Sequence, residues 1–335
     1  MQDKTKLNLV SSEIAGLWNV YMNDTMILCM LKYFINRLED EEIRPILQYA
    51  IDISNGHIQV VVDQFSQEGL PIPHGFKDMD VDINAPRLFT DTFYLYYLSN
   101  LAQYGMNFYA LMLNHMARSD IRDFFSKCLI ESIELINKIA DTLQQQGVYI
   151  RAPRVEFSKE VDYIDNQNYF SGGLLGKKRP LTAREITFLF ASIRYDIIGS
   201  ALITGFGQVT SSKKLNKYFF KGRDIANNNI EILTDIFIKE NVPIPSTSDA
   251  FITNSTISPF SDKFMLNHIL ILYGSRIGLD GVSLSYSLRH DLQAHFFASM
   301  AKIATYGEDG LDILVENRWM ETPPQIIVHK NLAKD

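Results

Sequence analysis

The sequence predicts an all-α protein made of two tandem four-helix bundles, and three observations support this prediction. The stretch Asp52–Pro73, DISNGHIQVVVDQFSQEGLPIP, returns without a gap as Asp224–Pro245, DIANNNIEILTDIFIKENVPIP. Each half of the chain contains four segments in which apolar residues recur every three or four positions, the spacing of one helical face. In each half a long polar stretch separates the second segment from the third.

Four helices are expected in the first half. They cover about residues 11–40, 41–68, 89–117 and 121–146. Gly69 follows the second helix, and two prolines lie shortly after it. A glycine is the usual residue just past a helix end, and a proline cannot continue a helix, so the second helix is expected to stop there.

The polar stretch at 70–88 is too long for a tight turn between neighbouring helices. It fits a connection that runs the length of a bundle, which is the topology of ferritin-like bundles. The second half repeats the same order. The offset between the halves changes from 172 to 171 after this connection, where Phe89 and Arg118 match Phe260 and Arg289. The sequence therefore predicts two tandem ferritin-like four-helix bundles, each with a long crossover between helices 2 and 3.

The predicted domain boundaries follow from these segments. Residues 1–151 form the first four-helix bundle, and residues 181–335 form the second. Residues 152–180 are a linker that we expect to pack on the bundles, because it retains aromatic and leucine side chains among its glycines. The two bundles are expected to pack on each other through their apolar third helices.

The overall composition narrows the classes of partner. Hydrophobic residues make up 46% and charged residues 21% of the chain, which is ordinary for a soluble globular protein with a sizeable core. The net charge of −7 argues against nucleic acid as a partner. Cys29 and Cys128 lie in apolar helical contexts, so buried free thiols are expected in a reducing compartment. The N-terminal residues lack the apolar core of a signal peptide, so a cytoplasmic location is expected.

One uncharged run is long enough to cross a membrane. Between Asp91 and Arg118 there is no Asp, Glu, Lys or Arg. The run contains amide side chains, a histidine and several tyrosines, which a lipid-facing helix would have in smaller numbers. We therefore expect a central helix covered by protein, and no transmembrane segment.

A ferritin-like topology raises the question of a di-metal centre. Such centres use Glu-x-x-His pairs, whose spacing points both side chains at one metal. None of the seven histidines has a carboxylate three residues before or after it. Oxidation chemistry of the ferritin type is therefore disfavoured in both halves.

Asp24 and His57 are the candidate metal ligands of the first bundle. Both occupy inward positions of apolar stripes, on the first and second helices, and are expected to meet mid-bundle. Tyr104 or Asn107 on the third helix are further candidates. One interpretation is a degenerate metal or small-ligand site. The preferred interpretation is a buried ion pair that fixes helix register, because a buried carboxylate is costly unless it is paired.

The second half offers weaker candidates. Asp196 matches the aspartate of the first half, but the position of the histidine is taken by Asn229, a poorer metal ligand. A separate cluster of His290, Asp291 and His295 falls near the corner between the third and fourth helices, where charge is usually solvated. Metal binding is the minor alternative at both places.

Several phrases of the chain resemble a known family. INAPRLFTDTFYLYYL, ARSDIRDFF and GGLLGKKRPL are similar to sequences in a family of proteins of unknown function from Bacillus-type spore formers. The resemblance extends from about Ser11 to Gln325. It implies two tandem ferritin-like bundles, a distant similarity to spore coat protein F, and a link to the spore coat. It transfers no catalytic residue.

We therefore expect a non-enzymatic structural or interaction protein, associated with the spore coat or with stress. The alternative is a metal- or small-ligand-binding bundle that uses Asp24 and His57. No cofactor is expected, with a metal ion in the first bundle as the alternative. The expected partners are other proteins or further copies of the chain. The expected location is the cytoplasm, with the forespore or the spore coat as alternatives.

Overall fold

The computed structural model describes residues 7–172, 178–245 and 250–327, and this part of the chain contains eight α-helices and no strand. The first four helices are α1 (Ser11–Asn36), α2 (Arg44–Gln67), α3 (Asp91–Leu113) and α4 (Ser119–Gln145). The all-α prediction is confirmed.

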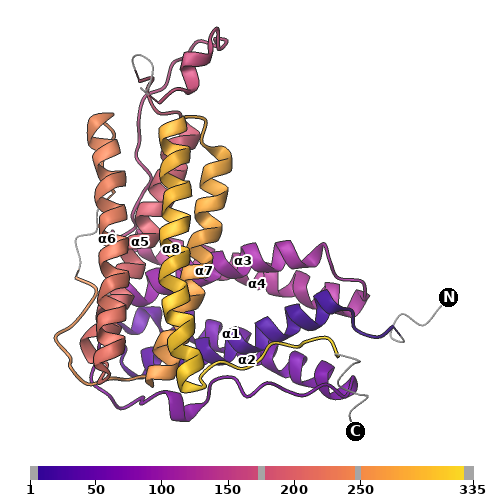
Figure 1. Ribbon diagram of the computed structural model, residues 1–335. Helices are drawn as coiled ribbons and strands as arrows, with labels where there is room; N and C mark the ends of the chain where they lie inside the picture. The colour runs from indigo at the N-terminus through magenta and orange to yellow at the C-terminus, as the bar shows by residue number, and fades with distance from the viewer. Residues whose placement is uncertain (1–6, 173–177, 246–249, 328–335) are drawn as a thin grey trace.

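The last four helices follow in the same order. They are α5 (Ala183–Val209), α6 (Lys213–Lys239), α7 (Asp262–Tyr286) and α8 (His290–Asn317). Helices α1–α4 pack together as one four-helix unit and α5–α8 as another, and the two units are set crosswise in an L-shaped molecule (Figure 1).

Two helices end earlier than predicted, for identifiable reasons. α1 stops at Asn36, because the backbone N–H groups of Glu39 and Asp40 donate hydrogen bonds to the Asp91 carboxylate at the start of α3, at 3.2 and 2.7 Å, in place of helical carbonyls. α3 stops at Leu113 because Glu13 accepts hydrogen bonds from the backbone N–H groups of Ala117 and Arg118, at 2.8 and 2.7 Å. These hydrogen bonds hold the backbone between α3 and α4 outside the helical conformation.

A single apolar core joins the two units. It contains Phe34 and Tyr97 of the first unit together with Phe206 and Phe264 of the second, all buried. The third helices of the two units meet, as expected, where the Tyr97 hydroxyl lies 3.0 Å from Nε2 of His268 on α7. Helix α5 also contributes to this junction, which the sequence did not predict.

The two long crossovers pair with each other at the same junction. Val81 forms an antiparallel bridge with Phe260, and Phe89 forms another with Ile252. Backbone hydrogen bonds reinforce them, including 2.8 Å from Asp82 N–H to the carbonyl of Pro259. The crossovers therefore tie the halves of the chain together through the backbone as well as through side chains.

The linker packs near its two ends and is exposed between them. Residues 156–168 are exposed and project from the end of the second unit in Figure 1, with Val161 94% and Tyr163 89% exposed. Charged and amide side chains outnumber the four large apolar ones in this segment. Val155, near the start of the linker, packs against an apolar cluster of the second unit, and Tyr169, near its end, lies against the Arg179 guanidinium. Residues 1–6, 173–177, 246–249 and 328–335 of the predicted domains lie outside the described residues.

One described helix, α5, is long and apolar enough to cross a membrane by length and composition. Within its most apolar window, 56% of the residues are buried inside the protein. A core helix satisfies the same criteria. Helix α3, which has no charged residue after Asp91 and was expected to be covered by protein, is buried along most of its first half.

A glycine on α5 permits a close approach between the units. A Cβ atom added to Gly205 would lie 2.5 Å from the ring of Phe89 in the first crossover. We predict that Gly205→Ala lowers the free energy of unfolding by about 1–3 kcal/mol, because the ring cannot retreat within a packed core. Gly199→Ala is the matched control. The same helix has nothing within 4 Å of an added Cβ there, and alanine should be neutral or stabilising. Equal effects in chemical denaturation would contradict the packing of this junction.

Glu185, at the start of α5, makes stability depend on pH. Burial alone would raise the pKa of its carboxyl, but the Arg179 guanidinium and backbone N–H groups of Thr182 and Arg289 lower the pKa from 4.5 to about 2. Because the folded pKa is depressed, this stabilisation is complete above about pH 4.5 and is lost as the pH falls toward 2. We predict that Glu185→Gln costs about 3 kcal/mol at pH 7 and progressively less in acid. Glu231→Gln, at an exposed position of α6, is the control and should show no such trend in denaturation curves.

Candidate functional site

Asp24 and His57 meet in the middle of the first unit. Asp24 projects from α1 and His57 from α2, and both are buried, with exposures of 5% and 2%. Nδ1 of the histidine lies 3.1 Å from Oδ2 of the aspartate. Ser54, one turn earlier on α2, donates a hydrogen bond of 3.0 Å to the other oxygen of Asp24. The aspartate is thus held on two sides by α2.

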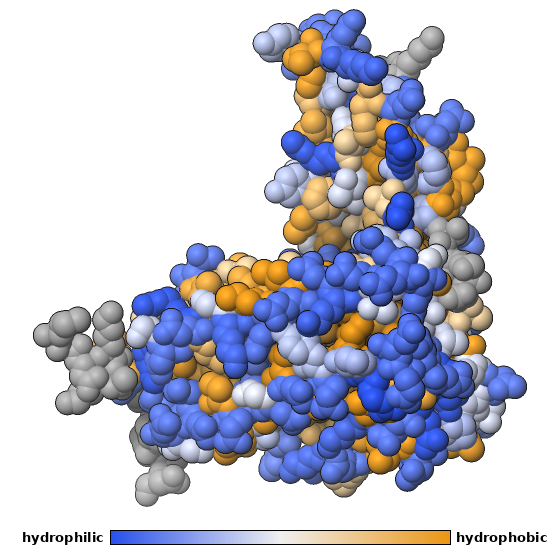
Figure 2. Space-filling model, turned by 180° about the vertical axis from the view of Figure 1, so that it is seen from behind, coloured by the Kyte–Doolittle hydropathy of each residue, from blue (hydrophilic) through white to orange (hydrophobic). Residues whose placement is uncertain are grey.

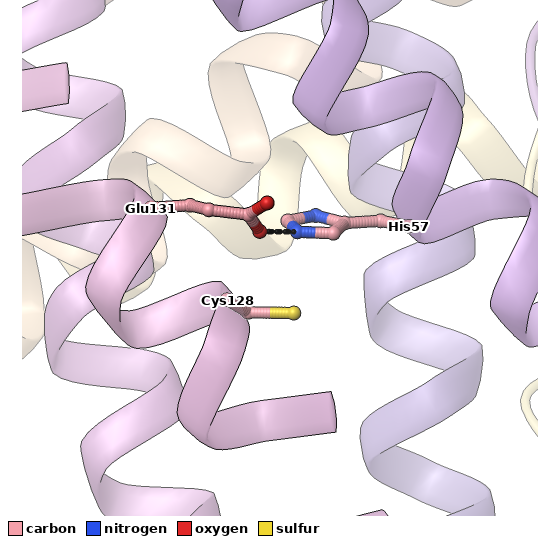
Figure 3. Close-up of side chains that lie close together, drawn as sticks. All are labelled: His57, Cys128 and Glu131. Atoms are coloured by element: carbon pink, nitrogen blue, oxygen red, sulfur yellow. Dashed lines mark hydrogen bonds and ion pairs between the residues drawn. The ribbon is translucent and has the colours of Figure 1, made fainter. Parts of the chain in front are cut away.

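A second carboxylate lies on the opposite side of the imidazole. Nε2 of His57 is 2.9 Å from Oε2 of Glu131, which projects from α4 (Figure 3). Lys127 reaches the other oxygen of Glu131 at 3.5 Å from the exposed surface. The two carboxylates therefore clamp the ring between them and connect α1, α2 and α4.

The two carboxylates around His57 favour the protonated, positively charged form of its imidazole ring. Burial opposes protonation of His57, but hydrogen bonds to Asp24, Cys128 and Glu131 outweigh it and raise the pKa to about 12. The Glu131 pKa is lowered, since His57 outweighs the opposing effect of burial. Burial raises the pKa of the Cys128 thiol, partly offset by the neighbouring histidine. Without a metal ion, the site is an imidazolium held by two carboxylates.

Three side chains of this site have ligand atoms close enough to hold a metal ion. They belong to His57, Cys128 and Glu131, and the atoms lie within 4.8 Å of one another. Figure 3 shows the Cys128 sulfur and the Glu131 carboxylate reaching from one helix toward His57 on another. Asp24 is not part of this set, because it contacts the opposite ring nitrogen. Asp24 and His57 thus lie in contact, as the sequence predicted. The residues that could bind a metal together with His57, however, are Cys128 and Glu131, and not Asp24.

Sequence reasoning missed Cys128 and Glu131, although a signal existed. The search was for carboxylates three positions from a histidine, whereas Glu131 lies three positions after a cysteine. Of the two further candidates, Tyr104 lines a small cavity of about 60 Å³ beside Asp24 and His57. Asn107 is exposed and does not join the site, because its position on α3 turns away from the interior.

The second unit has a different centre. Asn229 donates a hydrogen bond to Asp196, as the matching His57 contacts Asp24. The positive charge comes from Arg276 on α7, whose Nε lies 2.8 Å from Oδ1 of Asp196 and whose guanidinium also contacts Asp280. In the aligned sequence Arg276 corresponds to a glycine of the first unit, so its role could not be read from the conserved positions of the repeat.

The other histidine cluster does not assemble into a site. Asp291 pairs with Arg289 at 2.8 Å and with Lys178 at 2.6 Å. His295 points into the second unit, where burial and the nearby Arg276 lower its pKa. The side chains of Asp291 and His295 therefore belong to different interaction networks.

Comparison with known proteins identifies the family. The family described as "Protein of unknown function (DUF3231)" matches residues 1–161 and again residues 169–332. The chain belongs to the DUF3231 family. The two matches confirm both the resemblance to a family of unknown function and its presence as two repeats.

Comparison with solved structures adds one distant neighbour. A chain described as a "putative spore coat protein" from Bacillus halodurans C-125 is 17% identical, with a TM-score of 0.42. The match covers 46% of this chain and 100% of that one. No curated protein matches the sequence.

The clamp makes a prediction about stability. In metal-free protein, we expect Asp24→Ala to lower the free energy of unfolding by about 3–5 kcal/mol, because it leaves the buried charge on His57 without its partner on α1. Asp52→Ala removes an exposed carboxylate from α2, one that accepts a 2.8 Å bond from Gln48, and should change stability by less than about 0.5 kcal/mol. Denaturant titration measures both. An unchanged midpoint for Asp24→Ala would exclude a buried ion pair.

Proposed function

We propose that the protein is a non-enzymatic structural or interaction protein made of two tandem ferritin-like four-helix bundles. The proposed bundles comprise residues 1–151 and 181–335. In each unit the connection between the second and third helices is long, at 68–90 and 240–261, while the connection between the third and fourth helices is short. This contrast supports a ferritin-like topology.

The observation that carries the structural proposal is the junction between the units. One buried apolar core and two paired crossovers join them, so the halves hold a fixed mutual orientation. Proteins whose domains move for function usually have smaller and more polar interfaces between domains. A rigid L-shaped molecule is suited to holding partners at a set spacing.

Apolar side chains on the outer surface support the proposal that the partners are other proteins or further copies of the chain. Figure 2 shows apolar residues interspersed with polar ones over one face of both units. Individual large apolar side chains are exposed on several helices, among them Leu111 on α3 at 64%, and Phe297 and Val315 on α8 at 67% and 68%. We propose a cytoplasmic protein that associates with the forespore or the spore coat, on the basis of the resemblance of its sequence to spore coat protein F. A stress-associated role is the alternative within the same class.

Fractionation of spores tests this location. In a Bacillus-type host, we expect the protein to accumulate during sporulation and to be recovered in the coat extract, because a coat component stays bound when soluble forespore contents are removed. A soluble forespore enzyme serves as the control for leakage. Recovery only with that enzyme would contradict coat association, and equal amounts in growing cells would favour the stress-associated alternative.

Metal binding in the first unit is the second candidate function, favoured by the convergence of His57, Cys128 and Glu131. We propose no organic cofactor. Elemental analysis of protein purified without chelator tests this candidate. About one zinc, iron or manganese ion per chain, lost from a His57→Asn variant, would support it. Metal-free protein that also fails to take up added ions would leave the structural proposal alone.

A further inference from the structure

We propose that the first unit binds one zinc-class transition-metal ion through Nε2 of His57, the thiolate of Cys128 and the carboxylate of Glu131. Asp24 is a positioning residue that holds the histidine from its other nitrogen. This inference rests on the metal-binding candidate above and assigns its ligands, its metal class and its restriction to one unit.

The geometry needs only a small contraction. The three ligand atoms lie within 4.8 Å of one another. Tetrahedral zinc with Zn–N near 2.0 Å and Zn–S near 2.3 Å places its ligands about 3.5 Å apart. Cys128 and Glu131 are separated by three residues on α4, so both project from the same helical face. The remaining adjustment is one of side chains on two packed helices, since Nε2 of His57 already lies 2.9 Å from Oε2 of Glu131.

The surroundings of His57 match those of a metal-bound histidine. Metal-ligating histidines commonly donate their other ring N–H to a carboxylate, which fixes the tautomer and the orientation of the ring. Here Nδ1 lies 3.1 Å from Asp24, and Ser54 holds that carboxylate at 3.0 Å. Nε2 is then directed toward α4. An ion pair for register alone would not require a cysteine beside it.

Metal binding leaves the buried charge unchanged. Without metal, the carboxylates of Asp24 and Glu131 and the imidazolium of His57 give one net negative charge. A divalent ion enters as two protons leave to solvent, one from Nε2 and one from the Cys128 thiol. Two carboxylates, one thiolate and one dication again give one net negative charge. The exchange therefore adds no uncompensated charge to the interior.

The donor set selects the metal. Thiolate, imidazole and carboxylate together suit zinc and cobalt, whereas magnesium and calcium prefer oxygen ligands alone. Cys128 is fully buried, while the Glu131 side chain is 18% exposed and pairs with Lys127 at the surface. The ion can therefore enter past Glu131, and a water molecule can occupy the fourth position.

The second unit is an internal control. At the positions of the three ligands it has Asn229, Ser299 and Lys302. Its aspartate, Asp196, is instead neutralised by Arg276 at 2.8 Å. An ion there would meet a guanidinium and lack all three donors. The proposal therefore predicts one ion per chain.

Cobalt titration of the metal-free full-length protein tests the assignment. We expect one Co²⁺ per chain, a thiolate-to-cobalt charge-transfer band, intense d–d bands typical of tetrahedral geometry, and displacement by Zn²⁺. Cys128→Ser should abolish the charge-transfer band. Cys29→Ser, which alters the other buried thiol, should retain it. Asp24→Asn should keep the band but weaken metal affinity by about 10–100-fold, because it only orients the ring. Circular dichroism checks that each variant is folded.

The outcomes separate the two levels of the proposal. A bound ion without a thiolate band in the wild-type protein would overturn these ligands while leaving a metal-binding function in place. No uptake of Co²⁺ or Zn²⁺ would overturn both. Two ions per chain, or a band that persists in Cys128→Ser, would overturn the restriction to the first unit or the role of Cys128. These readings hold even if one variant fails to fold, because the wild-type spectrum alone reports the thiolate.

Discussion

A buried carboxylate sits at the same place in each four-helix unit, and the interior of each unit is arranged around neutralising it. Asp24 and Asp196 are 5% and 6% exposed, in surroundings where an unpaired charge would be strongly destabilising. The first unit supplies a histidine from its second helix, and the second unit supplies Arg276 from its third. The same requirement thus connects different helices in the two copies. The two repeats therefore share the buried aspartate and differ in the basic residue that neutralises it.

The choice of base decides what else each centre can do. An arginine has no lone pair to offer a metal and occupies its centre permanently. A histidine clamped by two carboxylates can exchange its proton for an ion, and Cys128 lies beside it in the first unit. In the second unit, Arg276 contacts both Asp196 and Asp280, which leaves a closed structural network. This difference is the basis for proposing metal binding in the first unit and a structural role for the centre of the second.

Much of the fold could be predicted from the sequence, because the positions of helices depend on local periodicity. Helical spacing and the internal repeat predicted the helices, their order and the inward positions of Asp24 and His57. The fourth helix was harder, since spacing alone does not show which of its faces meets α2. Glu131 and Cys128 were therefore missed. The neutralising role of Arg276 was hidden because the matching residue is a glycine. Pairing between the crossovers is a contact between distant segments, and no local pattern encodes it.

The exposed segment 156–168 connects the two halves without helping to hold them together. The apolar core and the paired crossovers hold the two units together. Exposed connections of this kind are the usual sites of proteolytic nicking. A chain cut there would remain assembled, with each fragment retaining its own four helices. In this respect the two halves behave as the subunits of a heterodimer whose members happen to share one peptide chain.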